Sequence, residues 1–276
     1  MEENLSIILI AHNEEQNIGK MIEGLLNDYE REILELIVVD DCSIDKTALI
    51  VGSWMNRNPK VKLLKRTLPS GVGRALKTGF SNINPKADYV LTMDSDFIES
   101  IAEVRLLINS IEEKGYAGVI GSRFMKGSRL IGYGITKRIA NRVFHFLVRA
   151  LFNIKQNDLT NNFKLYRTYI FRNLPWKSND YSMNAETGIL PIISGYRIGE
   201  VPISWVERGS QMGKSKFNIY KAGYGYLMTI FYAWRFLKMK RTLIFPRFKV
   251  LKSPRARRAR GRALKCKRSE IHPERE

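Results

Sequence analysis

Short apolar runs alternate with segments of helical periodicity over the first half of the chain. Ser6–Ala11 is apolar at every position after the serine, which is typical of a strand covered on both faces. Ile18, Met21, Ile22 and Leu25 then recur at helical spacing. Continued in this way, the pattern predicts strands at 6–11, 34–39, 61–64, 89–94 and 117–121, and helices from 18, over 45–56, from 71 and over 100–114.

This alternation predicts an α/β fold with a mostly parallel central sheet flanked by helices. In the second half the alternation weakens. There the pattern predicts an amphipathic helix at 137–152, a strand or turn at 164–167, a helix at 186–194 and a strand at 196–205. We expect this half to lean on the edge of the sheet and to form the second wall of a cleft.

Polar and acidic residues follow three of the predicted strands. They are Asn13 and Glu14, then Asp40 and Asp41, then Asp94 and Asp96. In a parallel sheet these strand ends share one edge, where open α/β sheets bind ligands. If the extended backbone persists past Met93, Asp94 and Asp96 face the same side and can hold one hard cation, Mg²⁺ or Mn²⁺. The alternative, without a metal, is that these acidic residues only cap the helix that follows the strand.

Composition limits the class of protein further. The 276 residues carry a net charge of +19, and residues 247–276 alone hold twelve Lys or Arg against three Glu. Such a charge favours nucleic acid, anionic lipid or phosphorylated substrates as partners. Cys42 and Cys266 indicate neither a disulfide framework nor a metal cluster, and the first residues show no signal-peptide pattern. We therefore expect a catalytic part on the cytoplasmic side.

With these motifs in place, the chain resembles the family-2 glycosyltransferases, in particular those of the dolichyl-phosphate mannose synthase type. The resemblance covers about residues 5–220. It rests on 6–11 with Asn13-Glu14-Glu15, on 38–47, on Gly71-Val72-Gly73-Arg74-Ala75, on 93–96, on 121–124, on 200–203, and on Arg208 with 213–216.

The resemblance implies a nucleotide-diphospho-sugar transferase fold of the GT-A type, a divalent cation and inverting transfer of a hexose. It implies a donor of the GDP-mannose or UDP-glucose type, with Asp94 and Asp96 as metal ligands and with Arg123 and Arg208 joining them as catalytic residues. The implied nucleotide-sugar pocket comprises Ala11, Asn13, Glu14, Asp40, Asp41, Gly71, Asp94 and Ser95. Ile98 stands where that type often has a polar residue assisting the metal, and no Gln-x-x-Arg-Trp motif of polysaccharide synthases occurs.

The acceptor decides whether a general base is needed. A sugar hydroxyl needs one, and Glu186 and Asp158 are the carboxylates that could serve. A polyprenyl (dolichyl) phosphate is already ionised and instead needs cations to hold it, for which the expected residues are Arg123, Arg138, Arg208 and Lys216. A nucleic-acid-binding protein is the rival from another class, but the acidic strand ends and the lack of a binding signature argue against it.

A lipid acceptor requires contact with a membrane. Residues 222–234 form an uncharged, aromatic-rich run with basic flanks, shorter than the ~20 residues that span a bilayer. Such a run suits an interfacial helix on an anionic membrane surface, and the alternative is a helix that packs on the domain. We expect a catalytic domain at 1–215, an interfacial or membrane-associated helix at 216–246, and a basic, disordered tail at 247–276.

Overall fold

The structure is a computed structural model, and it describes residues 2–206 and 219–244. The chain divides into a compact unit of residues 1–237 and a second unit of residues 238–276. Of the second unit, the structure describes the last residues of helix α8 (Ile219–Ile244).

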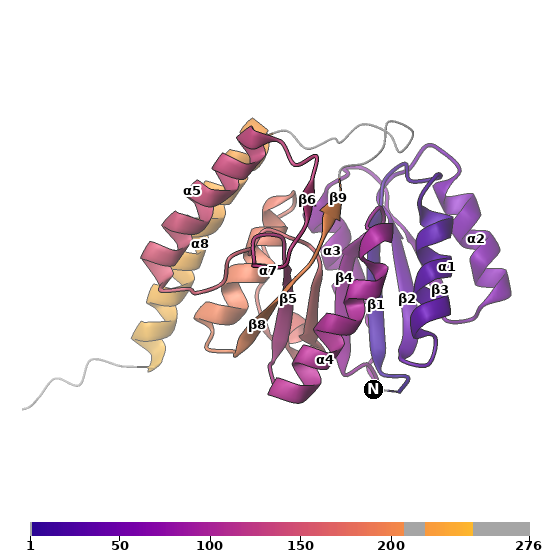
Figure 1. Cartoon of the computed structure of the whole chain (residues 1–276), viewed down its shortest axis with the longest axis horizontal. Helices are drawn as coiled ribbons and strands as arrows, with labels where there is room; N and C mark the ends of the chain where they lie inside the picture. The colour runs from indigo at the N-terminus through magenta and orange to yellow at the C-terminus, as the bar shows by residue number, and fades with distance from the viewer. Residues whose placement is uncertain (1, 207–218, 245–276) are drawn as a thin grey trace, which may run out of the picture. The chain divides into compact units, whose positions relative to one another are not determined.

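The centre of the first unit is a seven-stranded sheet of order β3-β2-β1-β4-β7-β5-β8 (Figure 1). Its strands are β1 (Leu5–Ala11), β2 (Ile33–Asp40), β3 (Val61–Lys65), β4 (Tyr89–Asp94), β5 (Gly118–Ser122), β7 (Lys164–Arg167) and β8 (Ile198–Pro202). Strand β7 is antiparallel to β4 and β5, and every other pairing in the sheet is parallel. The predicted mostly parallel sheet is confirmed.

Helices cover both faces of this sheet because its central strands are apolar on both sides. Leu5, Ile7 and Leu9 of β1 pack in one core, whereas Ile8 and Ile10 pack in the other. The first core includes residues of α1 (Ile18–Tyr29), α2 (Thr47–Arg57), the 3₁₀ helix η1 (Ile98–Glu103) and α4 (Val104–Lys114). The second includes residues of α3 (Val72–Ser81), α5 (Ile135–Phe152), α6 (Thr168–Asn173), α7 (Ser182–Ile193) and α8.

The second half of the chain differs from the sequence-based expectation at one strand. A single strand over 196–205 is wrong, because β8 ends at Pro202 and a separate strand β9 (Trp205–Val206) pairs with β6 (Leu130–Ile131). The backbone N–H of Ser204 donates to both carboxylate oxygens of Glu103, at 2.8 and 2.9 Å, instead of to a neighbouring strand. This contact redirects the chain toward β6.

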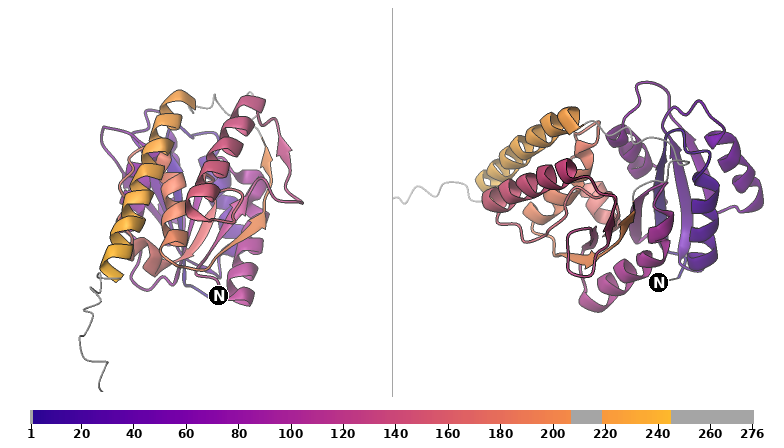
Figure 2. Two further views of the ribbon diagram at one scale, coloured as in Figure 1. Left: turned by 90° about the vertical axis from the view of Figure 1, so that its left-hand side faces the viewer. Right: turned by 45° about the horizontal axis from the view of Figure 1, so that its top comes forward.

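Helix α5 packs beside the first part of α8 (Figure 2). The rings of Phe144 and Tyr226 have centroids 5.1 Å apart at this contact. In the part of the chain that the structure describes, no helix combines the length and the apolar character needed to cross a membrane.

Candidate active site

Three strands bring their polar ends together at one edge of the sheet. Ala11 pairs with Asp40, and Ile10 pairs with Asp94, so the carboxyl ends of β2, β1 and β4 are adjacent. Strand β5 runs parallel to β4, since both are antiparallel to β7, and Arg123 follows its last residue. The expectation that the acidic clusters share an edge is confirmed, and this edge also receives Arg123.

Asn13 and Glu14 fasten the loop after β1 to the loop after β2. Asn13 has a φ of 57°, a left-handed conformation that asparagine tolerates better than most residues. Its Oδ1 accepts from the backbone N–H of Ile44 at 2.8 Å, and its own N–H donates to Ser43 Oγ at 2.9 Å. The backbone N–H of buried Glu14 donates to Oγ1 of Thr47, which follows β2, at 2.8 Å. The pair of loops is therefore held in place by the residues assigned to the nucleotide pocket.

Asp41 joins the loop after β2 to the loop between β3 and α3. One carboxylate oxygen pairs with Arg66, and the other accepts from the backbone N–H of Gly71 at 2.6 Å. A glycine is required at position 71 because an added Cβ would lie 2.4 Å from the carbonyl oxygen of Asn179. Asp40 accepts at 3.0 Å from the backbone N–H of Ser43. The structure thus brings Gly71 to the acidic edge.

Asp94 and Asp96 lie where β4 ends. The strand stops at Asp94, and a turn holds Ser95 and Asp96, so the condition of an extended backbone through Asp96 is not met. Met93 and Ser95 are nevertheless buried, while Asp94 and Asp96 keep partial exposure. Both residues thus keep part of their surface exposed where β4 ends, despite the turn.

These two acids can supply hard oxygen ligands to a divalent cation. Among residues 2–206 and 219–244, no group of three or more His, Cys, Asp or Glu forms a metal site. Ile98, at the position where a third ligand was in question, starts η1 instead. The donor set suits a cation whose remaining ligands are phosphate oxygens and water, as is usual for Mg²⁺.

Arg123 forms a buried ion pair with Asp158. The guanidinium donates from Nε at 2.7 Å and from Nη2 at 2.9 Å, and the backbone N–H of Arg123 adds a third bond at 3.0 Å. Burial raises the pKa of the Asp158 carboxyl, but Arg123 more than offsets this and holds the pKa below its usual range. Asp158 is therefore a fixed anion and a poor proton acceptor.

The carboxylate of Glu186 also accepts hydrogen bonds, in this case from the backbone. Its side chain is fully buried and accepts from the N–H groups of Lys177 at 2.6 Å and Ser178 at 2.8 Å. Neither carboxylate that could serve as a general base is open to a hydroxyl acceptor. The sequence pattern did not reveal these partners, which lie eight to thirty-five positions away.

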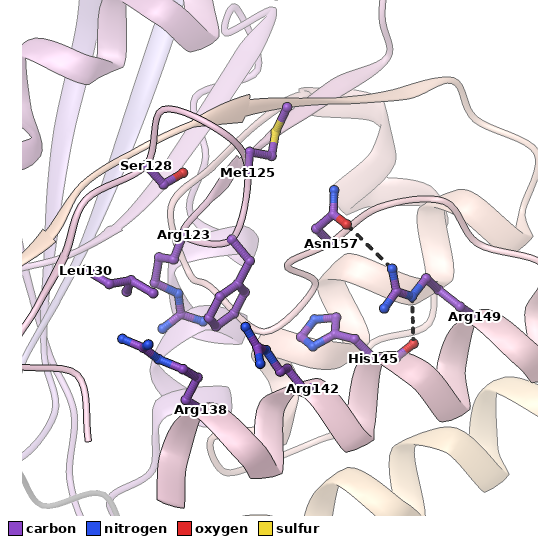
Figure 3. A pocket seen from close by; sticks show the side chains of 10 residues that line it. Arg123, Met125, Ser128, Leu130, Arg138, Arg142, His145, Arg149 and Asn157 are labelled. Atoms are coloured by element: carbon purple, nitrogen blue, oxygen red, sulfur yellow. Dashed lines mark hydrogen bonds between the residues drawn. The ribbon is translucent and has the colours of Figure 1, made fainter. Parts of the chain in front are cut away.

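A cationic cavity of about 400 Å³ lies between the β5–β6 loop and α5, and we call it the arginine pocket (Figure 3). Its lining residues are Arg123, Phe124, Met125, Ser128, Leu130, Arg138, Arg142, His145, Arg149 and Asn157. None of these described lining residues is a carboxylate. Arg123 and Arg138 are among the residues expected from the sequence, whereas Arg142 and Arg149 are not, although 138, 142, 145 and 149 have the spacing of one helical face. Arg208 and Lys216 lie outside the described residues.

Comparison with known proteins defines the class. Residues 6–174 match the model of glycosyl transferase family 2. The solved structures of glucosyl-3-phosphoglycerate synthase from Mycobacterium tuberculosis have the same fold. The complex with phosphoglyceric acid gives a TM-score of 0.65 at 18% identity over 83% of this chain and 79% of that one. The complex with Mn²⁺, UDP and glucosyl-3-phosphoglycerate gives a TM-score of 0.63 at 18% identity, over 82% of this chain and 77% of that one.

The fold is that of the nucleotide-diphospho-sugar transferases of the GT-A type, and the chain is a glycosyltransferase. The chain belongs to glycosyl transferase family 2. It is 26% identical over 219 residues to an undecaprenyl-phosphate mannosyltransferase of Micrococcus luteus, covering 76% of this chain and 86% of the relative. It is 27% identical over 223 residues to a dolichyl-phosphate hexose transferase of Haloferax volcanii, covering 80% and 90%.

Proposed function

We propose that this glycosyltransferase transfers a hexose, mannose or glucose, from a nucleotide-diphospho-sugar to a polyprenyl phosphate. The observation that carries the proposal is the arginine pocket, whose described lining residues include four arginines and no carboxylate. Such a lining suits a phosphate monoester as the acceptor, because one guanidinium group can donate two parallel hydrogen bonds to phosphate oxygens. The names of the two relatives point to the same acceptor class.

The proposed chemistry is a displacement at the anomeric carbon. An ionised oxygen of the acceptor phosphate forms the new bond, and the bond to the nucleoside diphosphate breaks with its electron pair staying on the diphosphate. Attack from the opposite side inverts the anomeric centre. The acceptor carries no proton that must be removed, which agrees with the commitment of Asp158 and Glu186 to other groups.

In this proposal Asp94 and Asp96 hold Mg²⁺ or Mn²⁺ against the donor diphosphate. The cation, when bound, offsets the negative charge that grows on the leaving group. Ala11, Asn13, Glu14, Asp40, Asp41, Gly71 and Ser95 line the donor pocket. Support comes from their placement on one edge and from neighbours of the same fold that were crystallised with Mn²⁺ and UDP.

Arg123 and Arg138 are the described residues that we assign to the acceptor phosphate, with Arg208 and Lys216 from outside the described part. Segment 157–162 connects Arg123 to the donor side, since Asp158 holds Arg123 while Asn162 donates to Asp94 at 2.9 Å. Acceptor and donor halves of the site therefore share one piece of backbone.

The surface of helix α5 is further evidence that the acceptor carries a lipid tail. One side of this helix lines the arginine pocket, and another lines an apolar groove of about 340 Å³ beside α8. Large apolar side chains are exposed on both helices, among them Phe146 at 67%, Leu227 at 60% and Phe231 at 50%. We propose that this surface rests on the anionic cytoplasmic face of a membrane, with the basic tail adding attraction.

The test is an acceptor competition. Purified protein is incubated with labelled UDP-glucose or GDP-mannose, a divalent cation, and either a polyprenyl phosphate or a neutral lipid-linked sugar. We expect one of the two donors to transfer its labelled hexose to the polyprenyl phosphate. The product should be a polyprenyl-phosphate hexose that contains a single phosphate. Label found only on the sugar hydroxyl would overturn the acceptor assignment and restore the need for a base.

A further inference from the structure

His145 is buried and hydrogen-bonded on both ring nitrogens. Its side chain is 2% exposed, Nδ1 lies 2.7 Å from the carbonyl oxygen of Asn141, and Nε2 lies 2.7 Å from the backbone nitrogen of Leu159. A carbonyl oxygen only accepts and a backbone N–H only donates. The ring therefore carries its proton on Nδ1 and accepts through Nε2, which only the neutral imidazole can do.

This bond ties α5 to the segment that holds Arg123. Leu159 follows Asp158, the partner of Arg123. A second tie lies four residues earlier on the helix, where Asn141 Oδ1 accepts from Thr160 Oγ1 at 3.0 Å. Arg138 and Arg142 are on α5 and Arg123 is on the facing side of the arginine pocket (Figure 3). The separation of these arginines thus depends on how α5 is held to 158–160.

We propose that His145 is a positioning residue for the acceptor: its neutral ring holds α5 against segment 158–160, and its protonation weakens acceptor binding while leaving donor binding unchanged. A cationic imidazole has two donors and no acceptor, so the N–H of Leu159 would face another N–H. The tie would open, and the two walls of the pocket would separate. This proposal rests on the assignment of the pocket to the acceptor phosphate.

The charges around His145 come from several elements. Burial lowers the pKa of the His145 ring, Asp158 raises it, and Arg123 and Arg149 lower it. Arg138 and Arg142, from its own helix, line the same pocket. Glu200 of β8 accepts from the backbone N–H of Asp158 at 2.9 Å. The net effect is a ring that stays neutral at neutral pH and titrates in acid.

The experiment compares the wild type with His145→Gln and His145→Leu between about pH 5.5 and 8, the range in which histidine titrates. KM for a short-chain polyprenyl phosphate, KM for the donor and kcat are measured at each pH. Glutamine can accept from the N–H of Leu159 through Oε1 without titrating, whereas leucine cannot. The chain has two other histidines, His12 after β1 and His272. His272→Gln is the matched control, because it removes a histidine away from the loop that follows β1.

We divide the acceptor KM of the wild type by that of His145→Gln at each pH. We expect this ratio to rise about tenfold toward acid pH, which corresponds to the loss of one charge-assisted hydrogen bond to the acceptor. This ratio cancels the titration of the acceptor phosphate itself. Donor KM should not follow it, and His145→Leu should show the raised acceptor KM at every pH. A ratio that stays constant with pH, or acceptor binding that tightens in acid relative to His145→Gln, would overturn the proposal.

A second readout separates this proposal from the assigned function. Ring nitrogen chemical shifts report the tautomer of His145, and inorganic phosphate serves as a probe of the pocket. If the wild type transfers no hexose to any polyprenyl phosphate, the proposed function fails. The positioning role then stands only if phosphate binding by the wild type still weakens in acid relative to His145→Gln, and it falls if both proteins bind phosphate alike at every pH.

Discussion

Asn162 donates a hydrogen bond from Nδ2 to Oδ1 of Asp94 across 2.9 Å. Asn162 belongs to the segment in which Asp158 holds Arg123, and strand β7 begins two residues later. Because β7 is antiparallel, its start lies at the edge where β4 and β5 end. A short connection therefore orients a proposed metal ligand and a proposed phosphate ligand together.

Arg138→Gln tests the acceptor side. The variant keeps a polar side chain but removes one cation from the arginine pocket. We expect KM for polyprenyl phosphate to rise about tenfold, since a hydrogen bond to a charged group contributes roughly 1.5–3 kcal/mol. Donor KM should be unchanged. Lys114→Gln, exposed at the end of α4, is the control, and an equal effect there would show that overall charge rather than the pocket is responsible.

Glu186→Gln tests the absence of a general base. A glutamine offers one acceptor oxygen to the two N–H groups of Lys177 and Ser178, so we expect a loss of about 1–3 kcal/mol in the free energy of unfolding. The rate of transfer by folded protein should stay within about threefold, far from the 10²–10⁴-fold that a base contributes. Urea unfolding and kcat measure the two effects, with exposed Glu113→Gln as control. A kcat collapse in a folded variant would contradict the proposed displacement.

Lys164 makes stability depend on pH. Burial lowers the pKa of its ammonium group from 10.5 to about 7, while Nζ donates to Thr187 Oγ1 at 2.8 Å. Between these values the unfolded chain binds a proton that the folded protein does not, so the free energy of unfolding rises with pH by up to about 1.4 kcal/mol per unit. Urea midpoints at pH 7 and 9 should show this slope for the wild type relative to Lys164→Met. Parallel curves for the two proteins would contradict a neutral buried lysine.

Leu227→Asp tests the proposed membrane surface. Leu227 is 60% exposed on α8 beside the apolar groove, so the change should cost little folding stability. Burying such a side chain contributes roughly 1.5–3 kcal/mol, and we expect binding to anionic vesicles to fall about tenfold or more in co-sedimentation. Leu49→Asp, 70% exposed on α2, is the matched control. Equal loss in both variants would indicate nonspecific charge repulsion.

The sequence predicted most of the fold because its signals are local. Strands such as β1 are buried on both faces, and their apolar runs are visible in a single window. Pairings across the chain were not predictable in this way: Arg66 with Asp41 and Arg123 with Asp158 join residues 25 and 35 positions apart. The end of β8 is a similar case, since it depends on Glu103 from another element. The sequence thus predicted at which edge of the sheet the site lies. The hydrogen-bond and ion-pair partners of the site residues became visible only in the structure.

The central claim is that a divalent cation held by Asp94 and Asp96 allows the nucleoside diphosphate to leave. The most direct measurement is hexose transfer by the wild type and Asp96→Asn with chelator, Mg²⁺ or Mn²⁺, using Asp88→Asn at the opposite end of β4 as control. We predict that chelator abolishes wild-type transfer, that either cation restores it, and that Asp96→Asn loses at least about 100-fold in rate, since metal stabilisation of a leaving group contributes several kcal/mol. Full transfer by the wild type in chelator, or by Asp96→Asn with either cation, would contradict the account.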